Sequence, residues 1–207
     1  MIKFNIIFLT VFLILFSSCS NEIKKKNILK EKNLELQVIE IYEEGLKELE
    51  DGYVLLAAKK FNEVEVLFPQ SDWAPKSALM ATYAYYSKDY YDEAIAEAER
   101  FLKVYPLHKN LDYVYYILAL SYYETIVDEK KDLQSIIEAK NFFNIITEKY
   151  PQTEYATDAN FKLDLINDIL SSKEMYIGRY YFNKKKWIPA IARFRNVIDE
   201  FDTTIYA

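Results

Sequence analysis

Residue types that most enzymes and metal proteins use for chemistry are scarce in this chain. One cysteine, one histidine and three glycines occur among its 207 residues. A single cysteine excludes an internal disulfide framework and any metal site built from several cysteines. There is no glycine-rich phosphate loop, nucleophile elbow or HExxH zinc motif, and the lone His108 lies in a proline-containing turn, where a structural role is the commoner one. We therefore expect no catalytic residues, no metal ligands and no cofactor.

Proline is also rare, and the charge balance is acidic. Five prolines, three glycines and a composition that is 51% hydrophobic favour helix throughout the chain. The net charge is −6, so no basic surface for nucleic acid is predicted. The charged residues are mostly Glu and Lys interspersed at helical spacing, which is typical of a solvated helix face.

One spacing of residues recurs four times in front of an anchor residue, which is Pro69, Pro106, Pro151 or Asp202. The positions twelve, eight, five and one residues before each anchor are small or apolar, and the last is always aromatic. The four sets are Ala57, Phe61, Val64 and Phe68; Ala94, Ala98, Phe101 and Tyr105; Ala139, Phe143, Ile146 and Tyr150; and Ala190, Phe194, Val197 and Phe201. Offsets of four, three and four place these residues on one face of a helix, and proline then ends the helix.

A second helical pattern lies upstream of each such helix, with a small residue 24 positions before the anchor and an aromatic residue 21 before it. Gly178 and Tyr181 fill these places before Asp202, and Thr82 and Tyr85 fill them before Pro106. A helix-turn-helix unit of about 34 residues with this spacing is typical of the tetratricopeptide repeat. The sequence therefore predicts an all-α solenoid of about four such repeats over residues 36–207.

The predicted repeats differ in length. The first covers 36–68 with its turn at Gly52, and the second covers 72–105 with its turn at 88–89. The third begins with a helix over 111–124, and residues 125–132 then add about eight residues, which form either an interaction loop or a tolerated surface loop. One long helix over 153–183 leads into the fourth repeat, which ends with a helix over 187–201. Residues 202–207 resemble 151–156, where a new helix starts, so we expect the C-terminus to be truncated or its last repeat to be missing.

The N-terminus has the pattern of a lipoprotein signal peptide, predicted over residues 1–18. Its apolar run, residues 6–16, spans only about 17 Å as a helix, against about 30 Å for a bilayer core. Two serines precede Cys19, as in a bacterial lipobox, so Cys19 is the predicted lipidation (palmitate) site; a chance cysteine beside an ordinary signal-peptidase site is the alternative. Residues 19–35 are polar and rich in lysine, which indicates a tether. The residue directly after Cys19 is Ser20 and not the aspartate that is associated with retention in the inner membrane. This favours an outer-membrane location.

Tyrosine is abundant, with 19 residues, and many fall at the groove-facing positions of the repeat. In a tetratricopeptide unit the first helix lines the concave face. The positions of this helix that face outward into the groove hold Leu46 and six tyrosines. The selected tyrosines are Tyr42, Tyr83, Tyr86, Tyr113, Tyr116 and Tyr123. Tyrosine combines apolar area with a polar tip, which suits a groove that binds a peptide. The alternative is that several of these rings simply pack between repeats.

Three stretches carry a sharper resemblance than the repeat itself: 68–74 (FPQSDWA), 91–95 (YDEAI) and 106–116 (PLHKNLDYVYY). In these stretches the chain resembles the BamD family, the tetratricopeptide lipoproteins of the outer-membrane β-barrel assembly machine. The resemblance covers the whole chain, including the lipobox, but without the family's fifth repeat. It implies a non-enzymatic scaffold, lipid-anchored on the periplasmic face of the outer membrane. Its implied partners are a BamA-like subunit and unfolded barrel precursors.

A different function on the same repeat is the alternative, namely a pilotin or a cell-wall-associated scaffold. The repeat pattern is common to both classes. Co-purification after detergent extraction separates them, because a barrel-bearing subunit in the eluate favours assembly, whereas a secretin or peptidoglycan fragments favour the alternative.

Overall fold

The described part of the chain is a series of helices without strands. In the computed structural model, residues 20–125 and 133–207 are described, with side chains from Asn33 onward. The helices are α2 (Ser20–Glu50), α3 (Val54–Leu67), α4 (Trp73–Tyr86), α5 (Tyr91–Val104), α6 (Leu111–Glu124), α7 (Gln134–Lys149), α8 (Glu154–Asn183) and α9 (Trp187–Glu200). The all-α prediction is confirmed. The predicted signal peptide, its Cys19 and residues 126–132 of the insertion lie outside the described residues.

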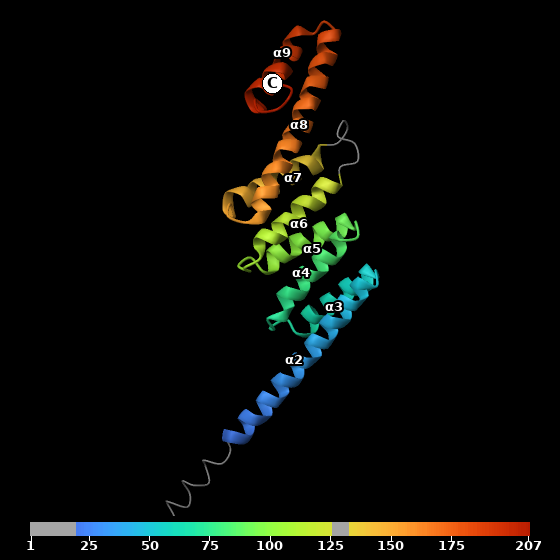
Figure 1. Cartoon of the computed structure of the whole chain (residues 1–207), viewed down its shortest axis with the longest axis vertical. Coiled ribbons are helices and arrows are strands. Elements are labelled where there is room, and N and C mark those ends of the chain that lie inside the picture. Colours follow the sequence, from blue (N-terminus) through green and yellow to red (C-terminus); the bar gives the residue numbers. More distant parts are fainter. Residues whose placement is uncertain (1–19, 126–132) are drawn as a thin grey trace, which may run out of the picture.

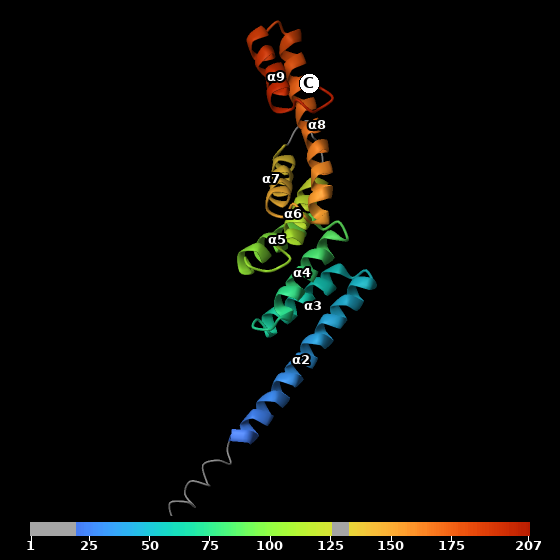
Figure 2. The same ribbon diagram turned by 60° about the vertical axis from the view of Figure 1, so that its left-hand side comes forward.

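The helices pack in chain order into an elongated stack of antiparallel hairpins, with α2 at one end and α9 at the other (Figures 1 and 2). The first helices of consecutive hairpins, α2, α4, α6 and α8, also approach one another. Within the described residues the backbones of the second helices, α3, α5, α7 and α9, stay farther apart, and α3 and α5 meet only through long side chains. The first helices therefore form the inner, more tightly curved side, as predicted for a tetratricopeptide-like solenoid.

The second helix of every hairpin ends in the same way, at the place that the repeat spacing predicts. The backbone N–H of the aromatic residue before each anchor donates to the carbonyl four residues earlier, which closes the last turn. These bonds are Phe68 to Val64 (2.9 Å), Tyr105 to Phe101 (2.8 Å), Tyr150 to Ile146 (2.9 Å) and Phe201 to Val197 (3.0 Å). Phe61, Phe101 and Phe143 are fully buried on the predicted face, whereas Phe194 of the last hairpin is partly exposed.

Small residues allow the first and second helices to approach closely. A Cβ atom built on Gly45 of α2 would lie 2.7 Å from Cε1 of Phe61, and one on Gly178 of α8 would lie 2.5 Å from Cε1 of Phe194. Thr82 of α4 is fully buried and donates its hydroxyl to the Ala78 carbonyl at 3.1 Å. Gly52 adopts a φ of +86° in the turn between α2 and α3, a conformation that favours glycine.

The structure shows where three of the helices begin or extend. Residues 20–35, predicted as a tether, form the first half of the 31-residue α2; their role as a tether stays a prediction. Ser71 would be a natural N-cap for α4 by its residue type, but its hydroxyl donates backwards to the Phe68 carbonyl at 2.8 Å. Asp72 occupies the cap position of α4 without a side-chain hydrogen bond. The long helix predicted over 153–183 is confirmed as the 30-residue α8.

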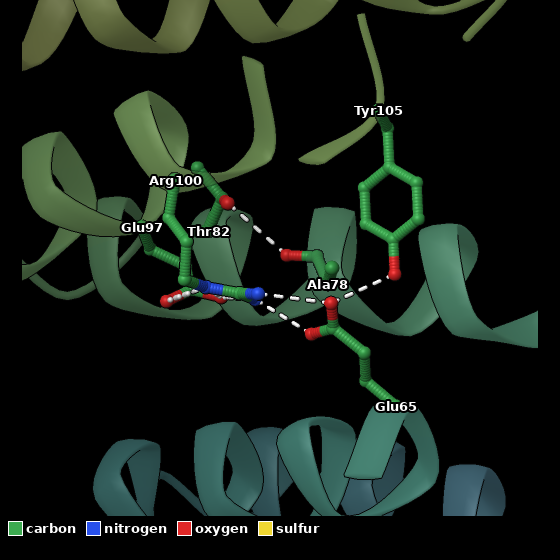
Figure 3. A network of polar contacts seen from close by, with 6 residues as sticks. All are labelled: Glu65, Ala78, Thr82, Glu97, Arg100 and Tyr105. Atoms are coloured by element: carbon green, nitrogen blue, oxygen red, sulfur yellow. Dashed lines mark hydrogen bonds and ion pairs between the residues drawn. The ribbon is translucent and has the colours of Figure 1, made fainter. Parts of the chain in front are cut away.

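One polar network joins the first two repeats on the side of the second helices (Figure 3). Arg100 of α5 donates to both carboxylate oxygens of Glu65 of α3, from Nη1 at 2.9 Å and from Nη2 at 2.6 Å, and it also pairs with Glu97. The Tyr105 hydroxyl donates to Glu65 Oε1 at 2.7 Å. Burial opposes ionisation of Glu65, but the hydrogen bonds from Arg100 and Tyr105 outweigh burial and lower its pKa. The network therefore stabilises the packing of one repeat on the next.

Candidate functional site

The inner side of the solenoid carries a group of tyrosines that come from three successive first helices. Tyr83 and Tyr86 lie in the last turn of α4, Tyr113 and Tyr116 in the first half of α6, and Tyr155 in the first turn of α8. The ring centroid of Tyr155 lies 5.5 Å from that of Tyr113 and 5.0 Å from that of Tyr116. Burial, followed by the hydroxyls of Tyr83, Tyr155 and Tyr86, raises the pKa of Tyr113 to about 12. We call these five residues the tyrosine cluster.

Carboxylates lie among these rings. The Tyr116 hydroxyl donates to Asp158 Oδ2 of α8 at 2.8 Å. Burial first and then this carboxylate raise the pKa of Tyr116. Burial, Glu124, Asp158 and Asp89, in that order of effect, raise the pKa of Tyr86. The inner face at this point is therefore aromatic and negatively charged.

Tyr91, at the start of α5, extends the cluster toward the turn between α4 and α5. Its ring centroid lies 6.1 Å from that of Tyr86, and its hydroxyl donates to Asp89 Oδ1 at 2.7 Å. That hydrogen bond, more than burial, raises the pKa of Tyr91 to about 12. Asp89 itself has a φ of 64°, which an aspartate tolerates better than most residues.

Tyr123 and Tyr42, also predicted to line the groove, lie outside the tyrosine cluster. Tyr123 of α6 carries the ammonium of Lys162 over its ring at 4.7 Å from the centroid, a cation–π contact between α6 and α8. Tyr42 of α2 packs against Phe61 at 5.4 Å and against Trp73 at 5.1 Å between ring centroids. The structure thus brings together four of the six predicted tyrosines.

A hollow of about 460 Å³ lies beside the tyrosine cluster, between α2 and α4. Its lining consists of Leu46, Leu49, Glu50, Met80, Tyr83, Ser87 and Lys88. Leu46 belongs to the residues predicted to face the groove, and Tyr83 is 38% exposed. The apolar side chains and the exposed ring can accommodate an apolar side chain, while Glu50 and Lys88 provide charge at its rim.

The sequence reasoning missed Tyr155, Asp158 and Lys162, all on the first half of α8. A signal for them existed in the repeat spacing, because Asp158 lies seven residues after Pro151 as Tyr113 lies seven after Pro106. Continuing the register past the third repeat would have selected this helix.

In residues 20–125 and 133–207, no group of three or more His, Cys, Asp or Glu side chains has an arrangement that could hold a metal ion. None of the helices in these ranges combines the length and the apolar character needed to cross a bilayer.

The fold and the inner face together define a class, a tetratricopeptide-like helical-repeat protein with clustered tyrosines on its concave side. Within that class the comparison with known families is specific. A match to YfiO, described as an outer membrane lipoprotein, covers residues 35–207, and the chain belongs to this family.

Several curated proteins are similar over most of the chain. The "outer membrane protein assembly factor BamD" of Caulobacter vibrioides is 38% identical over 91% of this chain and 61% of its own length. The protein of the same name from Rickettsia prowazekii is 36% identical over 81% of this chain and 66% of its own length. That of Neisseria gonorrhoeae is 31% identical over 82% and 67%. The chain therefore spans less than two thirds of the length of the first two relatives.

Proposed function

We propose that this chain is a non-catalytic scaffold in the assembly and insertion of β-barrel proteins into the outer membrane. Family membership supports the outer-membrane setting. The names of the relatives, outer membrane protein assembly factors, support the role in assembly. The proposal places the chain on the periplasmic face of the membrane, anchored by a lipid on Cys19. Its partners are a BamA-like barrel-bearing subunit and unfolded barrel precursors.

The tyrosine cluster is the observation that carries the precursor-binding part of the proposal. An unfolded barrel precursor presents segments in which apolar and polar side chains alternate, with aromatic residues near the ends of the segments. Tyrosine rings offer broad contact area and lose little conformational entropy on binding. The hollow beside Tyr83 can receive one apolar side chain. The hydroxyls of Tyr83, Tyr86 and Tyr113, which form no hydrogen bond with a described residue, can bond to the peptide backbone.

A double substitution in the tyrosine cluster tests this binding site. Tyr86→Ala with Tyr116→Ala should weaken binding of a peptide that copies the last strand of a barrel protein by more than about 2 kcal/mol. Fluorescence anisotropy measures the affinity, and circular dichroism confirms that the variant is folded. The matched control is Tyr176→Ala with Tyr180→Ala, two tyrosines of α8 that are 63% and 54% exposed. Unchanged affinity in a folded Tyr86/Tyr116 variant would assign these tyrosines to packing alone.

Co-purification tests the assembly role separately from peptide binding. The full chain, extracted from membranes in detergent, should bring down a BamA-like subunit. Recovery of a secretin or of peptidoglycan fragments without that subunit would overturn the assembly role and favour a pilotin or a cell-wall scaffold.

A further inference from the structure

Carboxylates predominate around Tyr86 in the tyrosine cluster, although Lys88 lines the hollow beside Tyr83 and Lys162 lies one helical turn after Asp158 on α8. Asp89, Glu124 and Asp158 all raise the pKa of Tyr86. Among the described residues, no lysine or arginine contributes to the pKa shifts of Tyr86, Tyr113 or Tyr116. The three carboxylates come from the turn after α4, the end of α6 and the first half of α8, so they flank the rings on more than one side.

Part of this negative charge is available to a ligand. Asp158 uses Oδ2 to accept the Tyr116 hydroxyl, and its other oxygen accepts no hydrogen bond from a described residue. Glu124 is exposed and forms neither a hydrogen bond nor an ion pair with a described side chain. A carboxylate in this state attracts a cation without first losing a partner.

Aromatic rings of the first helices already carry cations elsewhere in the molecule. The Lys162 ammonium lies 4.7 Å from the Tyr123 ring centroid, and the Lys76 ammonium lies 4.2 Å from the Trp73 ring centroid. In the tyrosine cluster no described cation occupies the ring faces. The cluster thus has the aromatic surface and the counter-charges of a cation site without an internal occupant.

We propose that the tyrosine cluster selects extended segments that carry a lysine or arginine two residues before an aromatic residue. Residues two apart in a strand point to the same side and are about 7 Å apart, so both side chains reach the cluster. The aromatic side chain packs among Tyr86, Tyr113 and Tyr116, and the cation lies between Asp158 and Glu124. This inference rests on the proposed function and specifies which precursor segments the site prefers.

Two labelled peptides test the selectivity. Both copy one barrel strand and are amidated at the C-terminus, and they differ only by Lys or Glu two residues before the aromatic residue. With the full chain in detergent, fluorescence anisotropy should show the Lys peptide binding about five-fold more tightly or better. The difference should shrink as the salt concentration rises from about 20 to about 500 mM, because salt screens exposed charges.

A matched pair of variants locates the effect. Asp158→Asn with Glu124→Gln should abolish the preference for the Lys peptide, since the amide oxygen of Asn can still accept the Tyr116 hydroxyl. Glu148→Gln with Asp199→Asn removes the same charge from exposed positions on α7 and α9 and should leave the preference intact.

The outcomes separate this inference from the proposed function. Equal binding of both peptides by the unaltered chain would overturn charge selectivity and leave the proposed function standing. A preference that survives the Asp158/Glu124 change, or that the control variant also loses, would assign it to net charge and overturn the site. Binding of neither peptide would overturn both.

Discussion

Gly45 of α2 lies directly against the ring of Phe61 in α3, so closely that a Cβ atom on the glycine would come within 2.7 Å of the ring. Gly178 and Phe194, also sixteen residues apart, form the same contact between α8 and α9. The two contacts differ in one respect. Phe61 is fully buried, whereas Phe194 is partly exposed.

Gly45→Ala should therefore destabilise the protein more than Gly178→Ala. Overpacking a buried site costs about 1–3 kcal/mol, and the better helix propensity of alanine returns about 1 kcal/mol. At Gly178 the ring of Phe194 has solvent on one side and should shift more readily than the enclosed ring of Phe61, so the net cost should be close to zero. Urea unfolding followed by circular dichroism measures both variants, and an equal or reversed order would contradict the explanation.

Phe101 and Phe143 should be among the largest single contributors to stability. Both are fully buried on the same helix face of successive repeats, Phe101 five residues before Pro106 and Phe143 eight residues before Pro151. Truncation of either to alanine should cost about 3–5 kcal/mol of unfolding free energy, since a buried ring is lost and a cavity remains. The control is Phe161→Ala on α8, where the ring is 65% exposed. A loss at Phe143 no larger than the loss at Phe161 would argue against the repeat packing.

The Glu65–Arg100 pair should make stability depend on pH. The folded state lowers the pKa of Glu65 below its ordinary value of 4.5, so its stabilising effect is present above about pH 4.5 and is lost as pH falls through the folded pKa. The difference in unfolding free energy between the unaltered chain and Glu65→Gln should accordingly shrink below pH 4.5. A difference that stays constant from pH 7 to pH 3 would show that the carboxylate charge is irrelevant.

Cys19→Ala should abolish anchoring of the chain through a lipid. Each acyl CH₂ buried in the membrane contributes about 0.8 kcal/mol, and two chains are enough for stable attachment. The variant should appear in the soluble fraction or remain attached through an uncleaved signal sequence. Labelling with radioactive palmitate checks the modification, and an unaltered chain that takes up no label would refute the lipoprotein prediction.

The repeat architecture could be predicted because it depends on short-range spacing. Residues four and three positions apart share a helix face whatever the tertiary structure, so the burial of Ala57, Phe61 and Val64 followed from their offsets alone. The long α8 followed from the absence of proline between 153 and 183. Tyr83, Tyr86, Tyr113 and Tyr116 were selected for the same face by the same counting.

The remaining features depend on the relative placement of distant helices. Whether Tyr42 lies beside the other tyrosines depends on the rotation of one hairpin relative to the next. The spacing of residues within a repeat does not specify that rotation. The contact between Glu65 and Arg100 joins residues 35 apart, and many other carboxylates were equally plausible partners. Ser71 has the residue type of a helix cap, but its hydroxyl found a nearer acceptor in the preceding turn. The first half of α2 lacks an apolar face in sequence, so local pattern alone gave no reason to extend the helix to Ser20.

The 30-residue α8 belongs to two hairpins at once. Its first half holds Tyr155 and Asp158 in the tyrosine cluster, and its second half packs on α9 through Gly178. A helix of this length measures about 45 Å. One end of α8 therefore lies in the groove, and the other end lies at the last hairpin. A tilt of about 5° at Tyr155 displaces the far end by about 4 Å over that length. If α8 moves as one rod, a shift of Tyr155 in the groove is therefore accompanied by a larger shift of the last hairpin.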